Sequence, residues 1–342
     1  MKIVCFRHFE KASECHSPFC KTLDDLGVDY YVFWDGHQIH YRHRLWLYFI
    51  EWPRLLFLAF LRTCWYLFGK KKYDFVVAWT HLELLPTVLL KKFLFMKHPP
   101  VVLSGFIFTP RRSTLRHCIR YTYFRWLLNQ LDFVIVHSRK EQKDYTQLFG
   151  FEDHQFVFVP FGTHVNILPK DENREPFIFS AGRSGRDYPL LMDAMEGLPY
   201  SLHVACDSFC PQKHPANVTV LDHCFNSDYL RELTDSELVV IPLEAENISA
   251  GQMVLIESMA LGKTVIITRT ETTEDYAIHN ETAFLVERGD KKALQDAIRF
   301  FMEHPEERRR IGENARRVFN ERFSMEAYTQ HLHTLLETQR EA

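Results

Sequence analysis

The segment from Leu238 to Thr268 constrains the fold of this chain more than any other, because it has the pattern of a strand, a loop, a helix and a second strand. The two flanking runs, 238–241 and 264–268, are short, apolar and rich in β-branched residues, as in central strands covered on both faces. Parallel neighbours need a crossover connection, so a helix is expected between them. The segment therefore predicts a βαβ unit in a parallel α/β sheet.

Small and polar residues mark the expected start of that helix. Ser249 and Gln252, three residues apart, form a capping-box pattern, which predicts a helix that begins at about Ala250 and ends near Gly262. The free N–H groups of the first turn would then point into the crevice at the carboxyl end of the first strand, where such sheets bind ligands. Gly251 would allow a phosphate to approach the backbone closely.

One face of the same helix carries a carboxylate among apolar neighbours. Met253, Glu257 and Ala260 are spaced by four and three residues, so they lie on one helical face. A carboxylate in such surroundings needs hydrogen-bond donors, and sugar or ribose hydroxyls are suitable ones.

Residues 257–266, ESMALGKTVI, resemble the fingerprint of the retaining GT-B glycosyltransferases of family 4. The resemblance implies that Glu257 holds the ribose of a donor nucleotide, and that Ala250 to Met253 belong to the donor site. The family places a first Glu eight residues before the second. That count gives Ser249 here, whereas the usual spacing from Pro242 gives Glu246, so both remain candidates for the contact with the donor sugar. The Ser-Ala-Gly-Gln start is similar to a variation within this group.

A second signature lies upstream, where an apolar strand pattern at 177–181 is followed by GRSGRDYP. Gly182 and the two arginines resemble the family's Gly-Arg and Lys positions, which neutralise the donor diphosphate. Arg183 matches directly, whereas Arg186 replaces Lys in a shorter loop. Guanidinium groups can stabilise a departing diphosphate without a metal. We therefore expect no metal and no cofactor beside a UDP- or GDP-linked donor; a solvated Arg-rich turn is the alternative.

Length and resemblance together predict two domains. A chain of 342 residues exceeds the comfortable size of one core. The GT-B resemblance implies an α/β architecture of two Rossmann-like domains whose parallel sheets face each other across a cleft. The expected parts are an acceptor domain, a linker, a donor domain and a helix that crosses back: 1–162, 163–175, 176–322 and 323–342.

Acceptor-side residues are less well marked in the first domain. Strand patterns occur at 2–6, 30–34, 75–78, 101–103, 133–136 and 156–160. His81 follows one strand end and is a candidate polar group facing the cleft, although a structural histidine fits equally. Glu10, after the first strand, is a candidate to orient the acceptor hydroxyl.

The two halves of the chain differ in charge. Residues 1–165 carry 22 Lys and Arg against 14 Asp and Glu, and residues 166–342 carry 19 against 30. The basic half is also rich in aromatics, most densely at 41–72, where Glu51, Pro53 and Arg54 interrupt any membrane-spanning run. This run has the composition of a surface helix that binds anionic lipid, and equally that of a helix pair packed inside the domain.

These patterns, with the resemblance, predict a glycosyltransferase that moves a sugar from a nucleotide-sugar to a hydroxyl acceptor, and the resemblance implies retention of the anomeric configuration. A lipid-linked or cell-surface glycan is the expected acceptor, and no nucleic-acid motif accompanies the basic charge. The first six residues have a strand pattern rather than a leader, and the eight Cys form no disulfide framework, so a cytoplasmic protein, peripheral on the membrane, is expected. An inverting GT-B enzyme and a silent GT-B-like scaffold are the alternatives. A dehydrogenase is disfavoured, because no GxGxxG follows the first strand.

Overall fold

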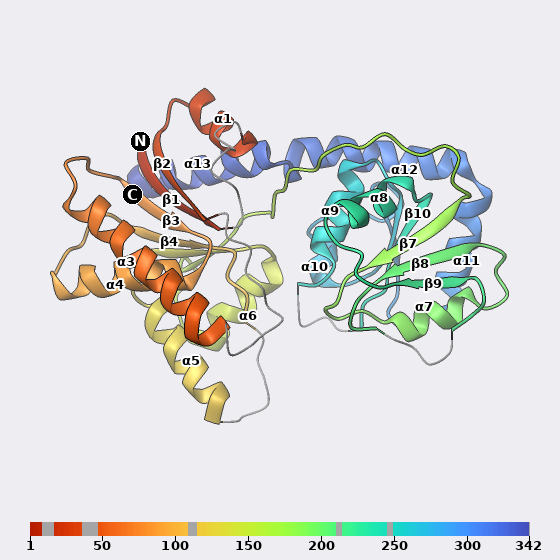
Figure 1. The fold of residues 1–342 in the computed structure, drawn as a ribbon, viewed down its shortest axis with the longest axis horizontal. Coiled ribbons are helices and arrows are strands. Elements are labelled where there is room, and N and C mark those ends of the chain that lie inside the picture. The colour runs from red at the N-terminus through yellow and green to blue at the C-terminus, as the bar shows by residue number, and fades with distance from the viewer. Residues whose placement is uncertain (9–16, 36–46, 109–114, 210–213, 245–248, 342) are drawn as a thin grey trace. The chain divides into compact units, whose positions relative to one another are not determined.

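The computed structural model describes residues 1–8, 17–35, 47–108, 115–209, 214–244 and 249–341, which form two compact units (Figure 1). Unit 1 consists of Met1–Val159 and Thr329–Ala342, and unit 2 of Pro160–Tyr328. Each unit is built on one parallel sheet of six strands with helices packed on it. The predicted α/β class with two Rossmann-like domains is confirmed.

Unit 1 has the strand order β2-β1-β3-β4-β5-β6. Its central strands are completely buried because helices cover both faces, which explains their continuous apolar sequences. In chain order its elements are β1 (Lys2–His8), α1 (Pro18–Asp25), β2 (Asp29–Asp35), the π-helical turn η1 (Leu47–Glu51), α3 (Trp52–Phe68), β3 (Phe75–Ala78), α4 (His81–Phe93), β4 (Val101–Ser104), α5 (Leu115–Leu128), β5 (Phe133–Val136), α6 (Arg139–Phe149) and β6 (Phe156–Phe158).

Helix α3 lies within the aromatic run at 41–72, and its two sides have different surroundings. One side of the helix packs inside unit 1, where Thr63 Oγ lies 3.0 Å from Thr87 Oγ of α4. The opposite side exposes apolar side chains, among them Phe57 at 61% and Phe68 at 65%. One side of α3 is therefore packed inside unit 1, and a lipid contact remains a prediction for the other side. None of the helices in the described part of the chain is long and apolar enough to cross a bilayer.

Unit 2 has the strand order β12-β11-β10-β7-β8-β9. Its elements are β7 (Phe177–Ala181), α7 (Tyr188–Met195), β8 (Ser201–Ala205), β9 (Val218–Leu221), α8 (Ser227–Asp235), β10 (Leu238–Ile241), α9 (Gln252–Ala260), β11 (Val265–Thr268), α10 (Glu271–Glu274), β12 (Phe284–Val286), α11 (Lys291–Glu303), α12 (Pro305–Val318), the π-helical turn η2 (Phe319–Phe323) and α13 (Met325–Glu341). Helix α13 contributes its first four residues to unit 2 and the rest to unit 1.

The order of strands in unit 2 reverses between β7 and β10, which are parallel neighbours in the sheet. From β7 the chain proceeds outward through β8 and β9, then returns to β10 and proceeds outward on the other side. Crossover helices therefore leave these two strands in opposite directions, which is the arrangement in which open α/β sheets bind ligands in a crevice beyond the carboxyl ends of the strands. The two sequence signatures follow β7 and β10, so the topology brings both to this crevice.

The segment expected to be a linker is attached to unit 2. Arg174 forms ion pairs with Glu232 and Asp235 at 2.9 and 3.0 Å, and its guanidinium lies over the Phe177 ring. Lys170 pairs with Glu237. These contacts hold residues 170–174 against the amino-terminal edge of the unit 2 sheet, at the opposite end from the crevice.

Candidate functional site

The loops after β7 and β10 are hydrogen-bonded to each other. The Glu244 N–H donates to the Gly185 carbonyl at 3.0 Å, and the Asp187 N–H donates to the Pro242 carbonyl at 3.1 Å. Between these bonds, Arg186 and Leu243 form an antiparallel bridge. The structure thus brings together the glycine-arginine loop and the segment leading to helix α9, as the sequence predicts.

Arg186 is the buried centre of this arrangement, with only 8% of its surface exposed. Its Nε donates to the Ala181 carbonyl at 2.9 Å, and its Nη1 donates to the Ser184 carbonyl at 3.0 Å. The guanidinium lies against Gly182, where φ is +117° and a Cβ atom would overlap it. Gly182 is therefore needed both for its backbone conformation and for the space it leaves.

The charge of Arg186 has no carboxylate partner among the residues that the structure describes. Burial lowers the pKa of its guanidinium, but arginine remains protonated in proteins. A buried charge without a counter-ion costs on the order of several kcal/mol. An anionic ligand would remove that cost.

Helix α9 begins two residues later than predicted, and its expected capping box is absent. Gly251, with φ of +86°, is the N-cap residue, so the predicted Ser249 cap is not formed. The predicted start at Ala250 is wrong because a left-handed residue cannot belong to a helical turn, so the Ser249–Gln252 pattern is overridden. The first turn of α9 thus begins at a glycine, which has no side chain to cap it, and the end of the helix at Gly262 is as predicted.

Arg186 and Ser249 both lie close to the start of α9. Nη1 of Arg186 is 3.8 Å from the position that a Cβ atom would take on Gly251, and Ala250 packs against Gly185. The Ser249 hydroxyl is buried and lacks a hydrogen-bond partner within the described ranges. A cation, a hydroxyl and the amino-terminal turn of a helix therefore lie near one another at the switch point, and together they are the kinds of donor that a diphosphate requires.

Glu257 is positioned by a residue that the sequence does not reveal. The Tyr229 hydroxyl of α8 donates to Glu257 Oε2 at 2.6 Å. Burial raises the pKa of the Glu257 carboxyl, and the hydrogen bond from Tyr229 offsets part of that rise. Burial, together with the charge of Glu257, raises the pKa of Tyr229 well above its usual range, so its phenol remains a donor. Met253, on the preceding turn of α9, is exposed.

Arg183 has surroundings different from those of Arg186. Its side chain is 58% exposed, and its Nε lies 2.5 Å from Asp207 Oδ1. The guanidinium also lies over the Phe225 ring, with Cζ 5.3 Å from the ring centroid. Arg183 therefore stands at the outer edge of the loop with its charge already paired, whereas the looser sequence match, Arg186, occupies the centre.

The candidates on the acceptor side fall in unit 1 or outside the described residues. His81 begins α4 and packs edge-on against Tyr123 and Phe124 of α5, at 5.8 and 5.1 Å between ring centroids. Burial, with the nearby Arg120 charge, lowers the pKa of His81 to about 4, so it is neutral at pH 7. Glu10 lies outside the residues that the structure describes, and so does Glu246, the candidate for the contact with the donor sugar.

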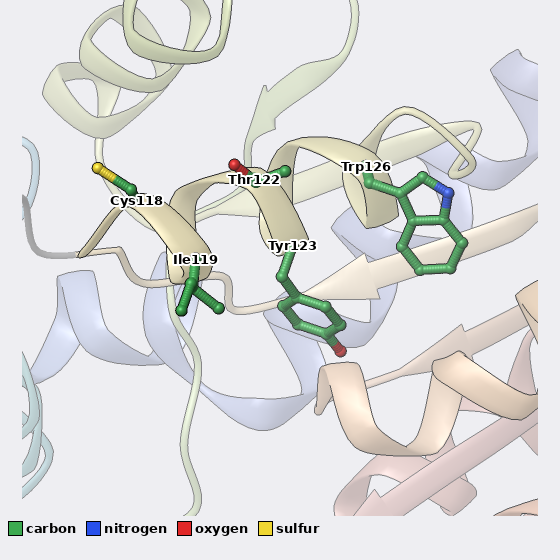
Figure 2. A pocket seen from close by; sticks show the side chains of 5 residues that line it. All are labelled: Cys118, Ile119, Thr122, Tyr123 and Trp126. Atoms are coloured by element: carbon green, nitrogen blue, oxygen red, sulfur yellow. The ribbon is translucent and has the colours of Figure 1, made fainter. Parts of the chain in front are cut away.

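An apolar hollow of about 500 Å³ lies along α5, next to the ring that His81 contacts. Figure 2 shows the side chains that line it: Cys118, Ile119, Thr122, Tyr123 and Trp126. All five come from this one helix. Their mainly carbon surface suits a hydrocarbon group better than a sugar.

Sequence models of two glycosyltransferase families match the chain. Residues 212–318 match "Glycosyl transferases group 1", and residues 19–166 match "Glycosyltransferase Family 4". Among curated proteins, the capsular polysaccharide biosynthesis glycosyltransferase CapM of Staphylococcus aureus is 30% identical over 122 residues. That match covers 36% of the present chain and 31% of CapM, so less than a third of the relative is matched.

Solved structures match over nearly the whole length. The Anabaena protein HepE in complex with UDP-glucose has a TM-score of 0.65 and 16% identity, covering 99% of this chain and all of HepE. Sucrose-phosphate synthase from Thermosynechococcus elongatus has a TM-score of 0.67 and 18% identity, covering 99% and 98% of the two chains. At such identities the likeness establishes the fold. With a glycosyltransferase model matching part of each half and GT-B structures matching the whole length, the chain has the GT-B fold and is similar to the group 1 and family 4 glycosyltransferases.

Proposed function

We propose that this protein transfers a sugar from a nucleotide-sugar to a hydroxyl group on an acceptor, with retention of the anomeric configuration. The observation that supports this most directly is the buried guanidinium of Arg186, which no carboxylate neutralises within the described part of unit 2. It lies beside the amino-terminal turn of α9, at the point where the strand order reverses.

In this proposal the donor diphosphate binds to Arg186, the first N–H groups of α9 and the Ser249 hydroxyl. As the glycosidic bond breaks, negative charge grows on the diphosphate, and these fixed donors stabilise it more strongly than they stabilise the intact donor. Glu257 accepts hydrogen bonds from the ribose, and Glu246 or Ser249 contacts the donor sugar. Arg183 contributes at the edge of the site, where the ligand would compete with Asp207 for it.

Retention requires the acceptor to attack on the face from which the leaving group departs. The donor phosphate then takes the acceptor's proton, so no protein side chain has to serve as the base. The state of His81 supports this route, because an imidazole with a pKa of about 4 is a weak base at neutral pH. An inverting enzyme that uses Glu10 as its base, and a silent scaffold, are the alternatives.

A nucleotide panel tests the proposal. We expect UDP or GDP to raise the melting temperature of the protein, with the corresponding nucleotide-sugar acting similarly, since a ligand that binds only the folded state stabilises it. UDP is the first probe, because the fold is shared with HepE, whose structure contains UDP-glucose. The control is Glu257→Ala, which should weaken the response. A wild type that responds to no nucleotide at millimolar concentration would refute the proposal.

The apolar surfaces of unit 1 favour a lipid-linked acceptor and an anionic bilayer as the place of reaction. Helix α3 exposes Phe57, Phe60, Leu61 and Phe68 on one face, which we call the α3 ridge. Exposed lysines at 70, 71 and 72 follow the helix directly. Apolar side chains next to cations are the composition that binds anionic lipid surfaces. The hollow on α5 would then accept part of the acceptor's hydrocarbon chain (Figure 2).

Liposome co-sedimentation tests the bilayer contact. We expect binding to vesicles that contain 30 mol% phosphatidylglycerol and little binding to phosphatidylcholine alone, with a marked loss at high salt. The double substitution Phe57→Glu and Leu61→Glu should reduce the bound fraction at least fivefold. Leu26→Glu, an exposed apolar residue after α1, is the control and should have little effect. Equal binding to neutral vesicles, or an unaffected double variant, would exclude this contact.

A further inference from the structure

We infer that Tyr229 positions the Glu257 carboxylate for the ribose of the donor. The inference rests on the proposed function and adds a residue that neither sequence signature contains. Tyr229 belongs to α8, which follows β9, whereas Glu257 belongs to α9, which follows β10. The fold brings them within 2.6 Å of each other.

The hydrogen bond determines which carboxylate oxygen remains for a ligand. A carboxylate has two oxygens and about four acceptor positions. Tyr229 donates to Oε2, so that oxygen is directed toward α8 and Oε1 is left for vicinal hydroxyls. The Tyr229 ring is itself fixed, because it packs against the unit 2 core and lies 5.9 Å from the Phe179 ring of β7. A rigid aromatic ring thus holds the carboxylate group in one orientation before a donor binds.

The same residue is also close enough to the diphosphate site to interact electrostatically with Arg186. Tyr229 is one of the groups that raise the pKa of the Arg186 guanidinium, against the larger opposing effect of burial. Arg186 in turn lowers the pKa of Tyr229, although burial and Glu257 dominate. Tyr229 is therefore near enough to interact electrostatically with the cation that would bind the diphosphate, while it donates a hydrogen bond to the carboxylate that would bind the ribose.

Removing only the hydroxyl of Tyr229 tests whether this residue positions Glu257. In Tyr229→Phe the ring and its packing are retained, but Glu257 loses a donor that stabilises its charged form. We expect the affinity for UDP, or for GDP if that is the tighter ligand, to fall about tenfold, as for loss of one hydrogen bond to a charged group. Because the pKa of Glu257 would rise further, the loss of binding at acidic pH should begin at a higher pH than in the wild type.

Calorimetric titration with UDP and with 2′,3′-dideoxy-UDP distinguishes a positioning role of Tyr229 from a purely structural one. If GDP binds more tightly than UDP, GDP and 2′,3′-dideoxy-GDP are used instead. If Tyr229 acts through Glu257 on the ribose, wild type and Tyr229→Phe should bind the dideoxynucleotide equally. Tyr200→Phe is the matched control, because it removes a phenol that donates to a carboxylate, that of Glu303, on another part of unit 2. This control should bind UDP like the wild type, with the same pH profile.

Three results would overturn the inference. Tyr229→Phe could bind the nucleotide like the wild type over the whole pH range, or it could weaken the dideoxynucleotide as much as the normal one. Either result removes the positioning role and leaves the proposed function intact. If the wild type binds neither UDP nor GDP, the proposed function fails and this inference fails with it.

Discussion

Replacing Arg186 by Met is expected to lower nucleotide affinity at least a hundredfold and to abolish detectable transfer. The diphosphate would lose its buried cationic partner, and truncating one side of a buried charge pair costs on the order of 3 kcal/mol or more. The free protein should lose little stability. The variant gives up two hydrogen bonds to carbonyls, each worth about 1 kcal/mol, but it also removes a buried charge that has no carboxylate partner in the described structure.

The control for this prediction is Arg183→Met, measured by the same titration with UDP or GDP. Arg183 is exposed and paired with Asp207, so its replacement should weaken binding less than tenfold. If Arg183→Met proves the more damaging of the two, the diphosphate binds at the outer edge of the loop and our assignment of Arg186 as the central cation is incorrect.

The substitution Gly182→Ala is expected to weaken nucleotide binding at least tenfold, because the new methyl group would displace the Arg186 side chain. The new Cβ atom would lie 2.7 Å from Cζ and 2.9 Å from Nε of Arg186, so the guanidinium would have to leave its position. In addition, φ of +117° is unfavourable for any residue with a Cβ atom, which should cost roughly 1 to 2 kcal/mol of folding free energy.

A glycine elsewhere in unit 2 separates these two effects. Gly289 also has a positive φ, +75°, but a Cβ atom there would meet nothing within 4 Å. Gly289→Ala should therefore lower the unfolding free energy, measured in urea, and leave nucleotide affinity unchanged. Equal nucleotide affinity in the two alanine variants would show that the contact between Gly182 and Arg186 has no part in binding.

The sequence predicts best those elements whose pattern comes from burial alone. Strands β3, β5, β7 and β10 have the predicted bounds, because a continuous apolar run flanked by polar residues has few other ways to be buried. The start of α9 is less predictable. A local capping pattern competes there with the packing of Gly251 against Ile241, and the packing prevails.

The roles of individual polar residues depend on geometry that is not local. The sequence resemblance ranks Arg183 above Arg186, but the turn at Gly182 and Gly185, both with positive φ, directs Arg186 inward and leaves Arg183 outside. Tyr229 cannot be identified from its neighbours in the sequence, because its partner lies on another helix. To identify Tyr229 from the sequence, one would need to know the order of strands in the unit 2 sheet.

The buried positive charge of Arg186 at the switch point has a kinetic consequence. Arg186 and the start of α9 would contact the diphosphate, and Glu257 the ribose, and both groups remain on the nucleotide after the sugar has left. The spent nucleoside diphosphate carries more negative charge than the donor, so it would be held at least as firmly. Turnover should then be limited by product release and inhibited competitively by the free nucleotide, and its rate in a cell would follow how quickly other enzymes remove that nucleotide.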